Sequence, residues 1–539
     1  MAPFVKSLGT VALATLASRI LGLVRDLLMA AYFGAGLVAD IFFIAFIIPN
    51  LFRRLVAEGA LSASFIPAYT ESMLKNGRDH SRRFASDVLV IQTFAVTLIA
   101  AAGIVLAPQL TALFSGRSMT PEFYALSVNL IRLMLPYIIL SSVVAFAMGY
   151  LNSHGAFFAP AFSTVLLNLG MIAGIVMGSR YFEQPVYGVA MGVLAGGMLQ
   201  VLLQIPYMVK HGFRLNFRVN FSNPELSRVF RAMLPAVLGI AAFQVNALVS
   251  NLLAAMIEEG SVSYIYYTTR LTELIFGVFI VSTANVMLPE MSRLRASAAA
   301  AGFQGKGVRA SAGNGLRASA ESTPEMDRIV SGSISAAMFV AVPAAAGLIA
   351  AGLPIVSFIF MRGNFAYLDA VMTYRSLVWA GAGLIFMALA RVVIPAFYTF
   401  KDTRIPLITS IISVAINLIL GYLLMRTVFK HAGLTLAGCI ASFVQSMLLL
   451  RYLAVRHGVR YPRKAVNQIF KILLSSTVMG LAVFYSATFV DWQHAACLLR
   501  AVSLTLIICG GAVLYYLCSL GLRVDEALYL HGRLRAYFR

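Results

Sequence analysis

The residues best suited to chemistry in this sequence are arginines inside long apolar runs. Five of them lie in three such runs: Arg19, Arg25, Arg53, Arg54 and Arg270. An arginine at the centre of a membrane helix costs about 2.5–3.5 kcal/mol on insertion scales, so such residues face a bundle interior or a water-filled cavity. A guanidinium binds phosphate or carboxylate through two parallel hydrogen bonds. The pattern therefore predicts a cationic cavity that receives an anion.

Polar side chains accompany these arginines at helical spacing. Ser18 and Arg25 lie seven residues apart and share a helix face, and Asn50 lies three residues before Arg53. The polar residues that we expect beside the arginines are Ser18, Asp26, Asp40, Asn50, Glu58 and Glu273. We predict no catalytic residue, no metal ligand and no cofactor.

A structural alternative exists for the same charges. Acidic residues lie close enough in sequence to form internal ion pairs that hold helices together. The pairs concerned are Arg25 with Asp26 or Asp40, Arg54 with Glu58, and Arg270 with Glu273. Because ionisable residues inside a membrane usually serve function, we favour the cavity.

The elements that position these residues are membrane helices. The chain has 539 residues, of which 60% are hydrophobic and only 12% charged, and its mean hydropathy is +0.85. This excludes a soluble enzyme, a disordered chain and a fibrous repeat. Since a membrane span needs about 20 apolar residues, we expect fourteen spans near 5–33, 40–70, 84–110, 122–150, 158–180, 186–209, 225–257, 262–292, 327–352, 368–400, 405–429, 433–455, 467–490 and 495–520.

The basic residues predict the orientation. The chain carries 42 Lys and Arg against 21 Asp and Glu, a net charge of +21, and the loops on the side of both termini hold most of the Lys and Arg. By the positive-inside rule both termini are cytoplasmic. The basic excess indicates orientation and attraction to membrane phospholipids rather than binding of nucleic acid.

Cysteines and histidines add no site. The four cysteines lie in apolar runs without metal-ligand spacing. Four histidines fall between the predicted spans and are expected to be solvated: His154, His211, His431 and His457.

Internal repetition predicts two lobes. Pro160 aligns with Pro406, 246 residues further on, and at the same offset His211 and Gly212 align with His457 and Gly458. We predict an all-α polytopic membrane protein: two six-helix lobes in pseudo-twofold relation plus a C-terminal helix pair. The expected boundaries are 1–215 for the N-lobe, 225–460 for the C-lobe with a flexible cytoplasmic loop at 296–323, 465–521 for the helix pair and 522–539 for a basic cytoplasmic tail.

Several of these residues together resemble the opening of the MurJ (MviN) family of lipid II flippases. The likeness lies in Ser18 to Asp26, Phe33 to Gly36 with Asp40, and Pro49 to Ala60, and it continues in Tyr266-Tyr267 with Arg270 and Glu273, Leu288-Pro289, Arg362-Gly363 with Phe365, Phe397 to Thr403, and His431 to Leu434.

The resemblance implies an exporter of the multidrug, oligosaccharidyl-lipid and polysaccharide superfamily in the bacterial inner membrane. Such a protein carries lipid II, a peptidoglycan precursor on an undecaprenyl diphosphate, to the outer leaflet by alternating access. It implies that five residues bind the substrate, namely Arg19, Arg25, Asp26, Arg53 and Arg270, and that five others support the cavity, namely Ser18, Asp40, Asn50, Glu58 and Glu273. Other cell-wall synthesis proteins are a further class of partner.

Some members of the family bind sodium through an aspartate on the seventh helix. Here the run 225–257 has no acidic residue beyond Glu225 at its start, which favours coupling to the membrane potential, worth about 2.3 kcal/mol per charge per 100 mV. By the same resemblance the last two helices form a groove for the lipid tail, whereas their composition alone fits a plain hairpin equally well. The alternative functions are a related exporter of another lipid-linked oligosaccharide or of drugs, and a membrane glycosyltransferase, which would need paired carboxylates in a larger external loop.

Overall fold

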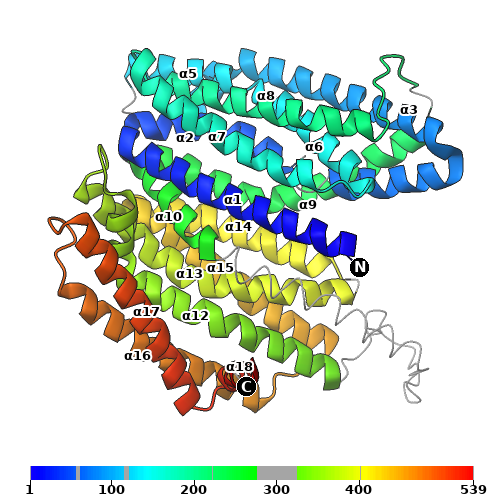
Figure 1. Ribbon diagram of the computed structural model, residues 1–539. Coiled ribbons are helices and arrows are strands. Elements are labelled where there is room, and N and C mark those ends of the chain that lie inside the picture. Colours follow the sequence, from blue (N-terminus) through cyan, green and yellow to red (C-terminus); the bar gives the residue numbers. More distant parts are fainter. Residues whose placement is uncertain are drawn as a thin grey trace, which may run out of the picture. The chain divides into compact units, whose positions relative to one another are not determined.

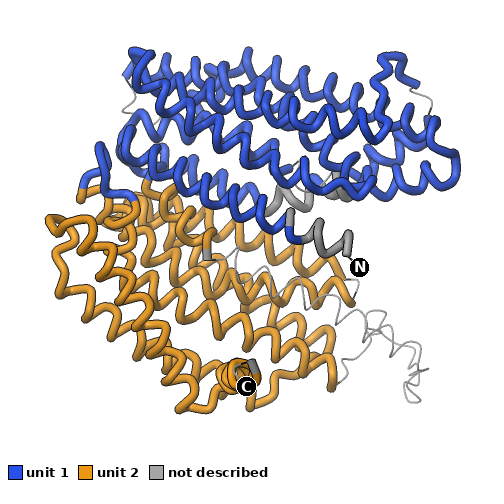
Figure 2. Tube along the Cα trace, in the orientation of Figure 1, with its two compact units in different colours: residues 1–263, 360–366 blue, residues 264–359, 367–539 orange. Residues whose placement is uncertain are grey.

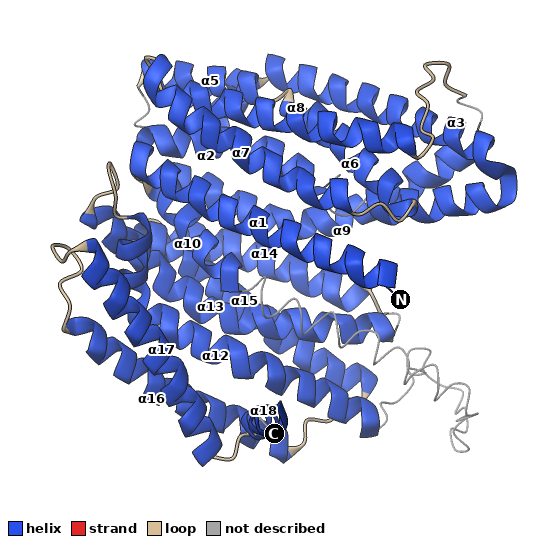
Figure 3. Cartoon of the chain, in the orientation of Figure 1, coloured by secondary structure: helices blue, strands red, loops and turns tan. Residues whose placement is uncertain are grey.

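The computed structural model describes residues 2–55, 61–114, 120–220, 223–275, 324–400 and 402–537. Every regular element within these ranges is a helix (Figure 3). A helix satisfies all its backbone hydrogen bonds within one segment, as a chain this apolar requires in a membrane. The all-α prediction is confirmed.

The helices follow the apolar runs (Figure 1). Their bounds are α1 Ala2–Phe33, α2 Leu37–Leu55, α3 Leu61–Val105, α4 Ala107–Phe114, α5 Pro121–Met134, α6 Tyr137–Ser153, α7 Phe158–Tyr181, α8 Val186–Lys210, α9 Pro224–Ala255, α10 Ser261–Ile275, α12 Pro324–Phe360, α13 Tyr367–Thr399, α14 Arg404–Leu424, α15 Lys430–His457, α16 Arg463–Thr488, α17 Cys497–Gly521 and α18 Asp525–Tyr537.

Ten helices in the described part of the chain are long and apolar enough to cross a membrane. The predicted spans at 5–33 and 225–257 are not among them, and neither is α2, the first half of the run 40–70. The predicted span 262–292 is described only as far as residue 275 and is not among them either. Three of these four helices carry the ionisable residues singled out above, since α1 holds Arg25, α2 holds Arg53 and α10 holds Arg270. The count of fourteen stays a prediction.

The predicted spans and the observed helices differ at several ends. The run 40–70 comprises α2 and the first turns of α3, and α3 itself bends at Gly77, where φ is 79°. The run 122–150 is divided into α5 and α6 near Pro136. The expected tail at 522–539 contains a helix, α18. The loop at 296–323 lies outside the described residues.

The chain forms two compact units (Figure 2). The first comprises residues 1–263 and 360–366, and the second comprises residues 264–359 and 367–539. These units are defined by compactness, whereas the two lobes were predicted from the internal sequence repeat. The lobe boundaries at 215 and 225 therefore stay a prediction.

In the first unit, α7 and α8 pack through a stripe of glycines. The stripe consists of Gly170, Gly174 and Gly178 on α7 and Gly188, Gly192 and Gly196 on α8. A Cβ atom at any of these six positions would lie within 3 Å of the opposite backbone. The two helices therefore approach each other more closely than any larger side chain permits.

Aromatic residues fill the core of the same unit, where α3, α6 and the start of α9 pack together. Phe65, Phe84, Phe146 and Tyr150 are fully buried there, and the rings of Phe65 and Phe146 lie 5.1 Å apart. This core fixes α6 and, with it, Asn152 in the last turn of the helix.

Two helix ends repeat between the units, as the sequence offset predicts. Helices α8 and α15 are each followed by a glycine with positive φ, Gly212 at 85° and Gly458 at 70°. The expectation that four histidines are solvated is wrong for His457 and His431, whereas His154 and His211 are half-buried. His457 is 4% exposed and stacks on Phe400 at 4.3 Å, and His431 is buried as well.

Candidate functional site

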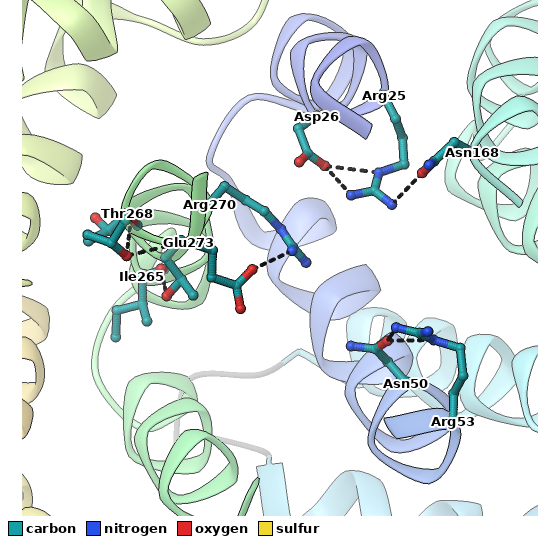
Figure 4. Close-up of polar contacts among 11 residues, drawn as sticks. Arg25, Asp26, Asn50, Arg53, Asn168, Ile265, Thr268, Arg270 and Glu273 are labelled. Carbon is teal, nitrogen blue, oxygen red and sulfur yellow. Dashed lines mark hydrogen bonds and ion pairs between the residues drawn. The ribbon is translucent and has the colours of Figure 1, made fainter. Parts of the chain in front are cut away.

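The guanidinium of Arg25 is held between two helices of the first unit. Its Nε and Nη2 donate to Oδ1 of Asp26 at 3.0 and 2.7 Å, and its Nη1 donates to Oδ1 of Asn168 on α7 at 3.0 Å (Figure 4). The side chains of Arg25 and Asp26 are 11% and 5% exposed. The carboxylate and the amide oxygen together fix the plane of the guanidinium and direct its remaining donors.

Asn168 is a residue of this site that the sequence analysis missed. Its Nδ2 donates to the backbone carbonyl of Ser18 at 3.1 Å, lies 3.4 Å from the Ser18 hydroxyl, and contacts the carbonyl of Thr164 at 3.3 Å. The available signal was a single asparagine in the apolar run 158–180. A polar amide within a membrane helix indicates a hydrogen bond to another helix.

Arg53 is oriented by Asn50, three residues earlier on α2. Its Nε and Nη2 lie 3.3 and 3.1 Å from Oδ1 of Asn50 (Figure 4). Pro49 precedes this pair inside the helix. The predicted contact at helical spacing is confirmed, and it leaves both residues half-buried.

In the second unit, Arg270 pairs with Glu273 on α10. Nη1 of Arg270 lies 2.9 Å from Oε2 of Glu273 (Figure 4). The guanidinium carbon lies 4.6 Å from the centre of the Tyr266 ring. The aromatic face adds a favourable interaction with the cation. Two ion pairs of the structural alternative, Arg25 with Asp26 and Arg270 with Glu273, are therefore present.

Asp40 binds the start of α10. Its described contacts include no arginine side chain. Its Oδ2 accepts from the Gly260 amide at 2.8 Å, and its Oδ1 accepts from the Ser263 amide at 2.7 Å and the Ser263 hydroxyl at 2.6 Å. In return, Oε1 of Glu259 accepts from the amide of Leu37 at the first turn of α2. Each carboxylate satisfies amides that a helix start leaves unpaired.

Arg19 lies apart from these pairs and lines a cavity in the first unit. The cavity has a volume of about 500 Å³ and lies among α1, α6 and α7. Arg54 lies near the end of α2 and is half-buried. Glu58, the remaining predicted residue, lies outside the described residues.

The structure thus joins Arg25, Asp26 and Ser18 through Asn168, and separately joins Arg53 to Asn50 and Asp40 to α10. The described residues contain no group of three or more His, Cys, Asp or Glu side chains that could hold a metal ion. What the site offers is oriented guanidinium groups, which bind anions.

Comparison with known proteins gives the family. A family model described as the lipid II flippase MurJ matches residues 29–503. A probable lipid II flippase MurJ of Haemophilus influenzae is 30% identical over 526 residues, covering 95% of this chain and 99% of the relative. One of Vibrio cholerae is 30% identical over 527 residues, covering 95% of each.

Solved structures agree on the fold. A lipid II flippase MurJ in an inward closed conformation matches with a TM-score of 0.77 at 24% identity, covering 95% of this chain and 98% of that one. An inward-facing multidrug resistance MATE transporter matches with a TM-score of 0.65 at 14% identity, covering 82% and 94%. With a family model that spans most of its length and full-length relatives at 30% identity, this chain belongs to the MurJ family of lipid II flippases.

Proposed function

We propose that this protein carries lipid II from the cytoplasmic to the outer leaflet of the bacterial inner membrane by alternating access. The observation that carries the proposal is the oriented, largely buried guanidinium of Arg25 in a chain of the MurJ family. No bond of the substrate is made or broken. The protein binds the charged headgroup, shields it from the hydrocarbon core and releases it on the other side.

The substrate-binding residues of the proposal are Arg19, Arg25, Asp26, Arg53 and Arg270. In the unloaded protein, carboxylates already neutralise two of the cations, Arg25 through Asp26 and Arg270 through Glu273. A diphosphate competes with these carboxylates for the same donors. Because the internal pairs reform when the substrate leaves, release does not strand an unpaired buried charge, which would cost several kcal/mol.

The remaining parts of the proposal concern the whole chain. Fourteen transmembrane helices form two six-helix lobes, 1–215 and 225–460, and a helix pair at 465–521. Both termini are cytoplasmic, and the basic segment 522–539 lies on that side. Membrane potential drives the outward movement of the anionic headgroup. Phospholipids surround the chain, and other cell-wall synthesis proteins are its candidate partners.

A related exporter is the second candidate, because the fold also matches multidrug transporters. A transporter of drug cations is expected to line its cavity with carboxylates and aromatic rings, since these attract cations. The arginines identified here favour an anionic substrate instead.

Complementation tests the proposal. A bacterium depleted of its own flippase receives this protein or its Arg25→Ala form, and lipid II exposed at the outer leaflet is measured together with the membrane level of each variant. We expect the parent to restore exposure and the variant to fail at equal membrane level. A correctly inserted parent that restores no exposure contradicts transport of lipid II and favours another lipid-linked substrate.

A further inference from the structure

We propose that the cavity around Arg19 is a separate subsite for a lipid-borne phosphate, occupied before the substrate reaches Arg25. This inference rests on the proposed function and divides its binding step into two. It concerns the first unit alone, because every residue of the cavity belongs to α1, α6, α7 or the turn between α6 and α7.

The cavity combines one cation with polar and apolar walls. Arg19 is its single charged residue, and Asn152 at the end of α6 and Thr164 on α7 add polar groups. Phe157 and Pro160 contribute apolar surface. A site of this kind fits a ligand with a charged head and an apolar stem.

The donors of this cavity are available to a ligand. Among the described residues, neither the Arg19 guanidinium nor the Asn152 side-chain amide makes a hydrogen bond or an ion pair with another side chain or the backbone. Arg25 differs, since Asp26 and Asn168 already bind it. An anion therefore binds at Arg19 without displacing a carboxylate, whereas at Arg25 it must compete with Asp26.

The cavity volume limits what it holds. About 500 Å³ lies within the range of small-molecule sites, roughly 300–1,000 Å³. A phosphate and the first units of an attached hydrocarbon chain are of this size, whereas a glycopeptide headgroup is larger. The cavity therefore has room for the phosphate and the start of its chain.

Asn168 connects this cavity to Arg25. Its Nδ2 contacts Ser18 and the Thr164 carbonyl, and both of these residues line the cavity. Its Oδ1 accepts from Arg25. Arg19 and Arg25 are six residues apart on α1, about 9 Å along the helix axis at 1.5 Å per residue. Six residues also turn the helix by about 120° net, so the two side chains lie on different faces of α1, and Asn168 is the residue that links the two positions.

The test uses the full chain in nanodiscs of zwitterionic lipid, with a polyisoprenyl phosphate as the probe. Asn152→Leu removes the amide at nearly constant volume, and we expect it to weaken probe binding about tenfold, as loss of one hydrogen bond to a charged group implies. Arg19→Ala removes the cation of the cavity and is expected to weaken probe binding more than Asn152→Leu does. Asn129→Leu on the exposed face of α5 is the matched control and should bind as the parent does.

Two further ligands separate the possible sources of the phosphate. Inorganic diphosphate is expected to bind at least tenfold more weakly than the polyisoprenyl phosphate, because it lacks the apolar stem. Equal binding of the two would overturn the lipid-borne assignment. Displacement of the probe by phosphatidylglycerol would assign the cavity to bulk phospholipid and overturn its place ahead of Arg25.

Transport kinetics separate this inference from the proposed function. Compared with the parent, the Asn152→Leu variant should need a higher lipid II concentration for half-maximal flipping. Its maximal rate should be unchanged, since only loading is impaired. Parent-like probe binding and kinetics of Asn152→Leu would overturn the subsite while lipid II transport stands. A parent that binds the probe through Asn152 yet flips no lipid II contradicts the proposed function and leaves the subsite intact.

Discussion

At the scale of single residues, the position of Arg25 depends on its shape as much as on its charge. Its three nitrogens reach Asp26 on one side and Asn168 on the other. A lysine carries the same charge as a compact ammonium on a flexible stem and cannot keep this planar arrangement.

We therefore expect Arg25→Lys to lower lipid II flipping by about tenfold or more, although net charge is unchanged. The lost fork geometry corresponds to about 1.4 kcal/mol or more of binding free energy. Flipping in vesicles measures the effect, with the membrane level of each variant determined in parallel. Parent-like flipping by the lysine form would show that charge alone is sufficient.

Asn168 gives a second prediction at this scale. Asn168→Leu keeps the side-chain volume and removes both the acceptor for Arg25 and the donor for Ser18. Because a buried donor then loses its partner, we expect about 1–3 kcal/mol of destabilisation and reduced flipping. Thermal unfolding in detergent measures the first and vesicle flipping the second. An unchanged unfolding temperature would contradict the bridging role of Asn168.

His154 predicts a pH dependence. Burial lowers the pKa of His154 below its usual 6.5, and the nearby positive charges of His211, Arg82 and Arg78 act in the same direction. The unfolded chain therefore takes up a proton at higher pH than the folded protein. Stability contributed by neutral His154 is complete above about pH 6.5 and is lost as the pH falls through its lowered folded value.

Thermal unfolding at pH 7.5 and 5.5 checks this. The parent should unfold at lower temperature at pH 5.5, and His154→Gln should show a smaller decrease because it has no proton to gain. His494→Gln, an exposed histidine beside Asp491, serves as the control and should keep the parent's decrease. An equal decrease in His154→Gln and the parent would assign the effect to other groups.

Residue types and spacing predicted part of this arrangement. Arg25, Asp26 and the Asn50 contact of Arg53 follow from charge in an apolar run and from helical periodicity. Asn168 could not be paired from sequence, because its partners Ser18 and Arg25 lie far away on another helix. The backbone amides bound by Asp40 carry no sequence signature at all.

At the scale of helices, apolar length predicted where helices lie and predicted their ends less well. The polar stretch between the predicted spans 40–70 and 84–110 contains the bend at Gly77, although hydropathy does not show that both sides of the bend belong to one helix. Nor does it separate α5 from α6, which belong to one predicted span and divide near Pro136. The histidines at helix ends were judged by their position between spans, and packing against aromatic rings overrides that position.

The glycine stripe gives a prediction at this scale. Gly174→Leu places a large side chain where a Cβ alone would already lie within 3 Å of Gly192. We expect α7 and α8 to separate and the protein to lose more than about 3 kcal/mol, beyond the usual range of overpacking. Membrane level and thermal unfolding measure the loss. Gly510→Leu on α17, where no atom lies within 4 Å of the added Cβ, is the matched control.

At the scale of the whole molecule, the predicted topology places residues of alternate loops on opposite sides of the membrane. Gln184 lies between α7 and α8, and Arg214 follows α8; both are exposed. On a cysteine-free background, Gln184→Cys should react with a membrane-impermeant maleimide in intact cells. Arg214→Cys should react only after the membrane is permeabilised. The reverse pattern would contradict cytoplasmic termini.

The close approach of α7 and α8 has a consequence for anyone who ranks residues by invariance among relatives. At six positions of this pair the only side chain that fits is a hydrogen atom, so selection on folding alone should keep them fixed. Their columns in an alignment would look as constrained as that of Arg25, although a glycine has no side-chain charge or donor to offer a substrate. Invariance at these six positions would reflect the lack of space between α7 and α8. A residue used in transport is distinguished from these glycines by a charge or a hydrogen-bond donor that faces a cavity.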